Sequence, residues 1–251
     1  MREPPARFDP DPSLSRAAME ALQRDIADAA VLADDLPFDP ARVGDRDPQA
    51  PVVAGVDQAF RTDRDPTVAV SAIVCWRGGE VVERTHATVE VTFPYVPGLL
   101  SFREAGPILA AFETLDGDPD LALFDGSGRL HFRQAGLATH VGAALDVPSV
   151  GVAKSLLCGT PRDPVDALPE GARVPIGVAP DDDVDAPAGT VIGYAYQSRQ
   201  FPDSRRINPL YVSPGHRVGA ETAVDLVERC GGDYKLPEPT RLADAYADEM
   251  K

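Results

Sequence analysis

Two carboxylates stand where the surrounding residues predict buried strands. Asp57 lies inside the β-branched run VAGVDQAF, and Asp125 directly follows the apolar run LALF. A carboxylate in a buried strand is costly unless it is paired or binds a cation. Each residue also has a purely structural interpretation. Asp57 can cap a turn at the end of its strand, and Asp125 opens Asp-Gly-Ser-Gly, a common turn sequence.

A third carboxylate, Glu104, has two interpretations that spacing alone does not separate. The segment SFRE matches the capping box, with Ser101 as the cap and Glu104 folding back on it. Alternatively, Glu104 shares a helical stripe with Ile108 and Ala111, four and seven residues further on. That stripe would face the sheet and bring Glu104 over the strand that carries Asp57.

These three carboxylates would form an oxygen-rich pocket if the fold brings them together. Such a pocket suits Mg²⁺, a hard ion that prefers octahedral oxygen ligands. It also suits phosphodiester cleavage, because the metal orients a phosphate, helps to deprotonate water and stabilises the leaving oxygen. A zinc site is disfavoured, because no histidine pair has the spacing of a zinc helix and the cysteines are dispersed.

Several basic side chains could complete such a site. His216 in YVSPGHRV comes between a predicted strand and a predicted helix, where free backbone N–H groups favour an anion. His216 can position water there, or it can simply be a polar surface residue. His131 and His140 can also be surface residues, and we expect His140 on an exposed helix face. Lys154 follows VGVA at a second parallel strand end, so it projects towards the same edge of the sheet as Asp125. It can contact a phosphate there, or it can be an ordinary surface lysine.

The loop FPYVPG, residues 93–98, is predicted to be rigid and aromatic. Pro94 and Pro97 fix its backbone, which can hold Tyr95 outwards as a group that stacks on a nucleic-acid base or wedges against it. Two prolines around a tyrosine can equally form a packed corner.

The elements that must position these residues are of mixed α/β type. The predicted strands are 51–60, 66–76, 81–93, 120–124, 147–153, 190–199 and 208–214, and the predicted helices are 14–35, 99–115, 131–145 and 220–230. The first three strands follow one another through short turns and are expected to pair antiparallel. The strands 120–124 and 147–153 are joined by the predicted helix 131–145, so we expect these two strands to be parallel.

The charge of the chain limits its partners. The sequence of 251 residues has a formal net charge of −16 and only three lysines. This balance favours a salt-rich cytoplasm, where the Debye length falls to about 3 Å and repulsion between carboxylates is screened. An ordinary acidic protein of a low-salt cell is the alternative. In both cases the acidity disfavours broad electrostatic binding of nucleic acid, so any phosphate-binding surface has to be local.

The sequence also bears on location. It has no apolar run of the roughly 20 residues that span a bilayer, and its start lacks the basic and apolar pattern of a signal peptide. Cys75, Cys158 and Cys230 are too few and too far apart for a disulfide framework or a CxxC metal site. We expect a soluble, cytoplasmic protein with reduced cysteines and no membrane partner.

Six segments, taken in order, resemble the endonuclease V family, the deoxyinosine 3′ endonucleases. They are GVDQAF, FPYVPGLLSFRE, LFDGSGRLHFRQAGLATHVG, PSVGVAKSLLCG, VIGYAYQSR and PLYVSPGHRV. The combination of PYVPGLLSFRE, GVAKSLL and YVSPGHR is specific, because another ribonuclease H-like nuclease would not supply all three.

The resemblance implies an α/β, ribonuclease H-like fold and hydrolysis that depends on Mg²⁺, for which Mn²⁺ can substitute. The family acts in DNA repair and cuts the second phosphodiester bond 3′ to a deaminated purine, leaving 3′-hydroxyl and 5′-phosphate ends. By motif position, Asp57, Glu104 and Asp125 match its metal-binding carboxylates. His216 matches a catalytic histidine near the metal and the attacking water.

The resemblance also implies substrate-binding residues. Tyr95 matches the wedge that separates the strands beside the lesion. Lys154 matches a residue near the cleaved backbone, and His131 aligns with a histidine that has a supporting role. The rest of the expected substrate-binding loop is Pro94, Val96, Pro97 and Gly98.

We expect a monomer whose chain divides into three parts. Residues 50–232 form the nuclease domain, 1–49 an N-terminal extension with one helix, and 233–251 a C-terminal tail. The expected partner is DNA that contains deoxyinosine or other deaminated bases. Two alternatives remain open: an endoribonuclease that acts at inosine in RNA, and a lesion-binding module that no longer cuts.

Overall fold

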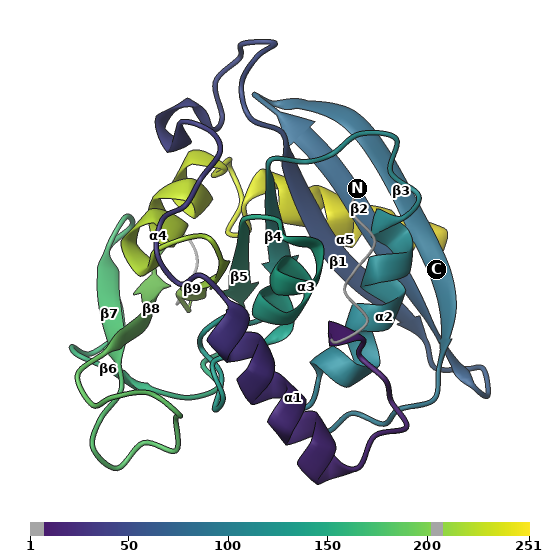
Figure 1. Cartoon of the computed structure of the whole chain (residues 1–251). Coiled ribbons are helices and arrows are strands. Elements are labelled where there is room, and N and C mark those ends of the chain that lie inside the picture. Colours follow the sequence, from purple (N-terminus) through teal and green to yellow (C-terminus); the bar gives the residue numbers. More distant parts are fainter. Residues whose placement is uncertain (1–7, 202–207) are drawn as a thin grey trace.

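The first three strands pair antiparallel, as predicted from the short turns between them. They are β1 (Val53–Arg61), β2 (Thr67–Arg77) and β3 (Glu80–Val91). Gly78 and Gly79 join β2 to β3 with positive φ angles of 54° and 98°, the conformation that a two-residue hairpin turn requires. This hairpin forms one side of the computed structural model, which describes residues 8–201 and 208–251 (Figure 1).

The remaining strands complete one mixed sheet. β4 (Leu121–Asp125) and β5 (Ser149–Ala153) run parallel to β1, so the predicted βαβ order is confirmed. β9 (Leu210–His216) and β8 (Val191–Tyr196) follow antiparallel, and the full order is β3-β2-β1-β4-β5-β9-β8-β7-β6. The sequence did not predict β6 (Thr160–Pro161) or β7 (Arg173–Gly177), because prolines interrupt both strands.

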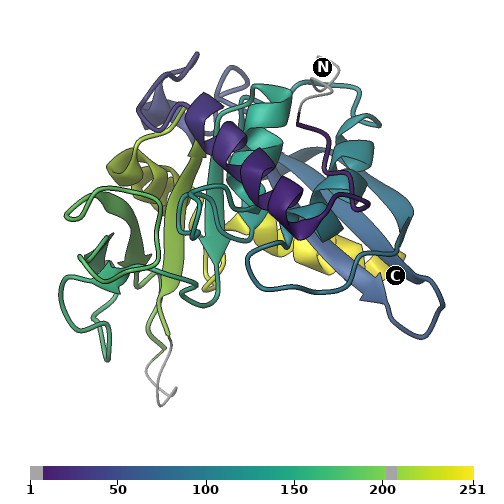
Figure 2. The same cartoon turned by 60° about the horizontal axis from the view of Figure 1, so that its bottom comes forward.

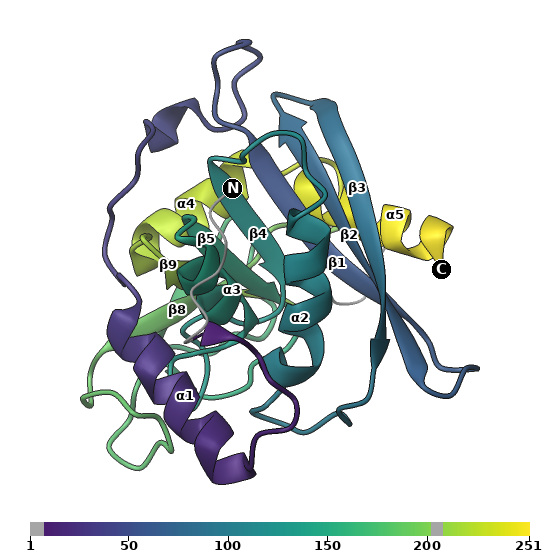
Figure 3. The ribbon, with the colours of Figure 1, turned by 45° about the vertical axis from the view of Figure 1, so that its right-hand side comes forward.

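Helices cover both faces of the sheet (Figure 3). α2 (Ser101–Phe112) and α3 (Leu137–Leu145) pack on one face, and α1 (Arg16–Ala29) lies across them (Figure 2). α4 (Ala220–Arg229) packs on the other face with α5 (Glu238–Met250), and a short 3-10 turn, η2 (Pro40–Arg42), precedes β1. No helix among the described residues is long and apolar enough to cross a membrane.

Two helices differ from the sequence expectation. α2 begins at Ser101 and ends at Phe112, within the expected residues 99–115, and it runs through Pro107 without interruption. α3 begins at Leu137 rather than at residue 131, because the preceding segment forms a loop. The expectation that His140 is exposed was wrong. α3 is enclosed by the sheet, α1 and α2, so His140 is completely buried, and its Nε2 lies 2.9 Å from the backbone oxygen of Phe8.

The C-terminal helix α5 packs directly on the backbone of β1. A side chain at Gly55 would place its Cβ 2.0 Å from the carbonyl of Pro239, so only glycine allows this approach. The contact fixes α5 across β1 and β2, towards the β3 edge of the sheet (Figure 3).

Candidate active site

Strand register brings the first two candidate carboxylates together. β1 and β4 are parallel, with Val56 opposite Phe124, so Asp57 and Asp125 are neighbours at the carboxyl end of β4. A third carboxylate, Asp244, reaches them from α5. One oxygen from each of the three lies within 4.8 Å of the other two. The structure therefore builds an acidic cluster at the strand ends where open α/β sheets bind ligands.

Glu104 joins this cluster from the opposite face of the sheet. Leu100 is the N-terminal cap of α2 and makes no side-chain hydrogen bond, and the buried hydroxyl of Ser101 has no partner. The capping-box interpretation is therefore wrong. The stripe interpretation is confirmed, because Glu104 and Ile108 line a cavity of about 210 Å³ together with Asp57 and Asp125. We call this cavity the carboxylate pocket.

The electrostatics of the carboxylate pocket are unfavourable without a cation. Burial, the charge of Asp125 and a hydrogen bond with Asp244 raise the pKa of Asp57 to about 8. Burial and the charge of Asp125 also raise the pKa of Glu104 to about 7, against the opposing charge of Arg103. Both carboxyl groups are thus held partly protonated at neutral pH. A bound cation would relieve the repulsion that causes this.

The donor set fits a divalent cation that prefers oxygen ligands. Asp57, Asp125 and Asp244 come from three different elements, and within residues 8–201 and 208–251 no histidine or cysteine joins their cluster. Carboxylate oxygens at this spacing suit a hard ion such as Mg²⁺ better than zinc.

Lys154 lies beside Asp125, as the sequence predicts. It follows β5, and its Nζ donates to Oδ2 of Asp125 at 2.6 Å. Desolvation opposes the charged form of Lys154, but this hydrogen bond and the nearby carboxylates raise its pKa. The side chain remains half exposed, so the ammonium group is accessible from outside.

A second cavity of about 280 Å³ adjoins the carboxylate pocket. We call it the loop cavity, because one of its walls is the segment 94–98, hereafter the PYVPG loop. Tyr95, Gly98 and His131 line it, and Asp125 lines both cavities. Tyr95 is 68% exposed and stands at the rim.

The members of the PYVPG loop have different environments. Pro94 and Pro97 are exposed, whereas Val96 is half-buried and packs against Met19 and Leu99 instead of lining the loop cavity. His131 is buried rather than on the surface. Burial and the charge of Arg133 lower its pKa to about 4, so the imidazole is neutral.

The structure does not bring His216 to the carboxylates, so the expectation that it lies beside the metal is corrected. His216 ends β9 opposite Ser149, whereas Asp125 lies opposite Val152, three residues or about 10 Å further along β5. Its Nδ1 accepts from the backbone N–H of Val31 at 3.3 Å, and its Nε2 lies 3.2 Å from Asp146. His216 therefore fastens the segment after α1 to the sheet.

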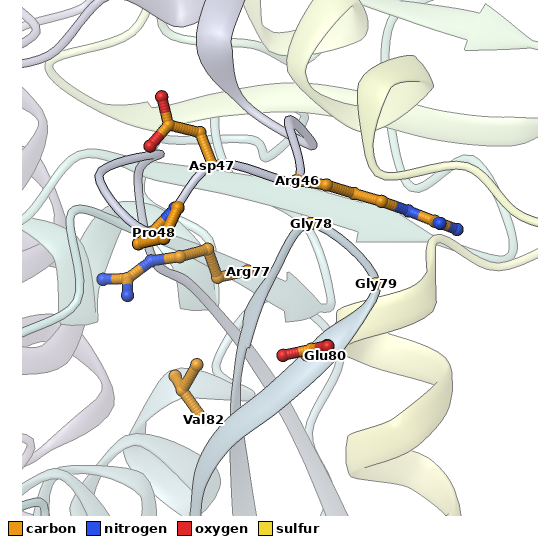
Figure 4. A pocket seen from close by; sticks show the side chains of 8 residues that line it. All are labelled: Arg46, Asp47, Pro48, Arg77, Gly78, Gly79, Glu80 and Val82. Atoms are coloured by element: carbon orange, nitrogen blue, oxygen red, sulfur yellow. The ribbon is translucent and has the colours of Figure 1, made fainter.

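A larger cavity of about 560 Å³ lies at the far end of the sheet, beside the β2–β3 hairpin turn. Its two arginines do not converge on a common point, because Arg46 and Arg77 extend in opposite directions (Figure 4). Arg77 Nε donates to the backbone oxygen of Ala50 at 2.9 Å. This cavity lacks the arrangement of a binding site.

Sequence reasoning missed Asp244. It lies in the C-terminal segment, which carries no recognised motif, and it is separated from Asp125 by more than a hundred residues. One signal was present: Gly55, inside a β-branched strand two residues before Asp57, marks a place where another backbone approaches closely. The approaching backbone is that of α5.

Three antiparallel strands followed by the parallel strands β4 and β5, with helices on both faces, give the mixed α/β sheet of the ribonuclease H-like class. The chain belongs to the endonuclease V family, whose model, described as Endonuclease V, matches residues 41–245. It is therefore an endonuclease, a hydrolase that acts on phosphodiester bonds.

Individual relatives agree with this assignment. Endonuclease V of Natronomonas pharaonis is 62% identical over 245 residues, which cover 98% of this chain and 95% of the relative. The crystal structure of Streptomyces avermitilis endonuclease V matches with a TM-score of 0.77 at 32% identity, covering 94% of this chain and 92% of that one. Ciona intestinalis endonuclease V, solved with a 24mer DNA containing an inosine followed by a ribo-adenosine, has the same fold, with a TM-score of 0.74 at 24% identity and coverage of 93% and 96%.

Proposed function

We propose that this protein cleaves DNA at deoxyinosine and hydrolyses the second phosphodiester bond on the 3′ side of the lesion with Mg²⁺ as cofactor. The observation that carries the proposal is the position of Asp125, which lines both the carboxylate pocket and the loop cavity. A base held in the loop cavity would keep its own strand beside the carboxylates. The inosine-containing DNA bound to the Ciona relative supports this choice of substrate.

Asp57, Asp125 and Asp244 would hold the ion, and Glu104 lines the same pocket. When bound, the ion orients a phosphate, lowers the pKa of the attacking water and stabilises the leaving oxygen. Lys154 is positioned to contact a phosphate oxygen of the cleaved strand, because its half-exposed ammonium group lies beside Asp125 and lines the loop cavity.

The loop cavity is the place for the extruded base. Enzymes that act at a damaged base take it out of the stack into an enclosing pocket, which requires the neighbouring strands to separate. Tyr95 stands exposed at the rim of this cavity, and an aromatic ring can stack there on the base that remains.

Cleavage of a defined duplex tests the proposal. Purified protein with Mg²⁺ is incubated with a 5′-labelled duplex that carries one deoxyinosine, and the product length is read at single-nucleotide resolution. We expect a nick one nucleotide beyond the lesion and no nick when adenine replaces hypoxanthine. Absence of nicking across a range of salt concentrations would refute the function. A matched RNA strand in parallel decides between the DNA and RNA activities.

A variant pair connects the activity to the carboxylate pocket. Asp125→Asn should lose at least about 100-fold in rate, because the pocket loses a charged metal ligand, while binding of inosine DNA persists. Asp63→Asn, an exposed aspartate in the β1–β2 turn, should cleave like the wild type. Unchanged cleavage by Asp125→Asn would exclude its role as a metal ligand.

A further inference from the structure

The N-terminal helix is joined to the PYVPG loop by a buried amide. Met19, Gln23 and Ile26 form the buried stripe of α1, and Gln23 is its polar member. The side chain of Gln23 is completely buried, and its Nε2 donates to the carbonyl oxygen of Gly98 at 2.9 Å. Burial of an amide is unfavourable unless both of its ends are hydrogen-bonded.

The second partner of this amide is Arg133, whose Nε donates to Oε1 of Gln23 at 2.7 Å. Both ends of the amide are thus satisfied, one by the PYVPG loop and one by the loop that precedes α3. Arg133 also reaches Gly98, with Nη2 3.5 Å from the carbonyl oxygen, and its ion pair with Glu20 at 3.7 Å connects it back to α1.

His131 adds a third contact to the same carbonyl. The backbone N–H of Arg133 donates to Nδ1 of His131 at 3.2 Å, so the neutral ring carries its proton on Nε2. That Nε2 lies 3.1 Å from the oxygen of Gly98. Gly98 itself has a φ of +77°, a conformation that other residues rarely adopt. The end of the PYVPG loop is therefore fixed at one carbonyl.

Apolar contacts support the loop from the same side. Met19 of α1 packs with Leu99 and Phe102, and Val96 is half-buried against this cluster. α1 lies beside the segment that leads from β3 into α2 (Figure 3). Tyr95, by contrast, is not a member of this cluster and remains exposed.

We propose that Gln23 is a positioning residue for strand separation. It holds the Gly98 end of the PYVPG loop on α1, so that Tyr95 keeps one orientation towards the duplex. The inference rests on the proposed function, because it requires that Tyr95 separates the strands. It also extends the substrate-handling part of the molecule into α1, which lies outside the residues 41–245 matched by the family model.

The test compares cleavage rates on inosine in a duplex and in a single strand. Only the duplex requires strand separation, so the ratio of the two rates reports on the loop, while a general loss of folded protein cancels. Gln23→Met keeps the size of the side chain and removes both hydrogen bonds. We expect it to lower the ratio about tenfold. Tyr95→Ala should also lower the ratio.

A double-mutant cycle shows whether Gln23 acts through Tyr95. In the Tyr95→Ala background, Gln23→Met should not lower the ratio further, because the group that it positions is absent. Gln49→Met makes the same chemical change at an exposed site and should keep the wild-type ratio. Gln23→Glu retains an acceptor for Arg133 but turns a carboxylate towards the Gly98 carbonyl. Gln23→Glu should therefore also lower the ratio, and it replaces Gln23→Met in the test if Gln23→Met does not fold.

The outcomes separate the inference from the proposed function. If Tyr95→Ala lowers the ratio and neither Gln23 variant does, the role of Gln23 is refuted and the function stands. Full additivity of Gln23→Met and Tyr95→Ala would also refute it, since it would show that Gln23 acts elsewhere. A wild-type protein that cleaves neither substrate would overturn the proposed function itself.

Discussion

At the scale of single residues, the carboxylates of the carboxylate pocket are buried and repel one another, and a bound cation would offset this repulsion. Asp57 is raised in pKa to about 8 and Glu104 to about 7. In the unfolded chain both groups ionise near pH 4. Between these values the folded protein holds protons that the unfolded chain has released, so these two groups make the fold less stable as pH rises from about 4 towards 8.

Asp57→Asn tests this dependence. In metal-free solution, the free energy of unfolding of the variant should increase relative to that of the wild type as pH rises from about 4 towards 8, because the variant has no carboxyl group to ionise at this position. Added Mg²⁺ should reverse the order, because only the wild type keeps all its ligands. Thermal unfolding with chelator and with Mg²⁺ measures both effects. A difference between the proteins that does not change with pH would contradict the coupling.

Residue types and spacing predicted part of this site. Asp57 and Asp125 were identified because each ends or interrupts an apolar run. For Glu104 spacing left two interpretations open, and only the resemblance in motifs assigned it to the metal site. His216 was misplaced because a motif fixes the position of a residue in the sequence but not the end of the sheet on which it lies. Asp244 was missed because contacts between distant segments leave no periodic pattern.

At the scale of elements, α5 determines whether the site is complete. Its only connection to the chemistry is Asp244, which reaches Asp57 and Asp125 across β1. Asp244→Asn should therefore reduce the thermal stabilisation by Mg²⁺ and lower the cleavage rate by about tenfold or more. Asp248→Asn, one turn later on the same helix and exposed, is the matched control. Equal effects of the two changes would show that the charge of α5, not Asp244, is what matters.

The close contact between α5 and the backbone of β1 at Gly55 gives a second prediction. Gly55→Ala would place a methyl group 2.0 Å from the carbonyl of Pro239, closer than any relaxed contact. The helix has to shift, and we expect a loss of about 1–3 kcal/mol in the free energy of unfolding, with a weaker response to Mg²⁺. Denaturant unfolding and a Mg²⁺ titration measure the two effects. Wild-type values in both would mean that α5 is not held at this contact.

The order of the elements was predictable because consecutive strands and helices carry strong local patterns. β7 escaped prediction because Pro175 removes a backbone donor from the middle of the strand, a position that sequence rules assign to loops. The role of α1 also escaped prediction, because its amphipathic pattern shows that it packs but not on which loop.

At the scale of the whole molecule, the charge of −16 sets two opposing responses to salt. Screening reduces repulsion among surface carboxylates, since the Debye length falls from about 10 Å at 0.1 M to about 3 Å at 1 M. The same screening weakens contacts between Lys154 and a phosphate.

Stability and substrate binding should therefore separate as KCl is raised. We expect the melting temperature to increase steadily from about 0.1 M upwards, because the folded state concentrates like charges that the unfolded chain disperses. We expect KM for the inosine duplex to rise over the same range, with a shallow slope, because few basic groups contact the backbone. A melting temperature that is independent of salt would show that repulsion between the acidic side chains does not affect the stability of the fold. A steep rise in KM would show that the basic DNA-binding surface is larger than the region around Lys154.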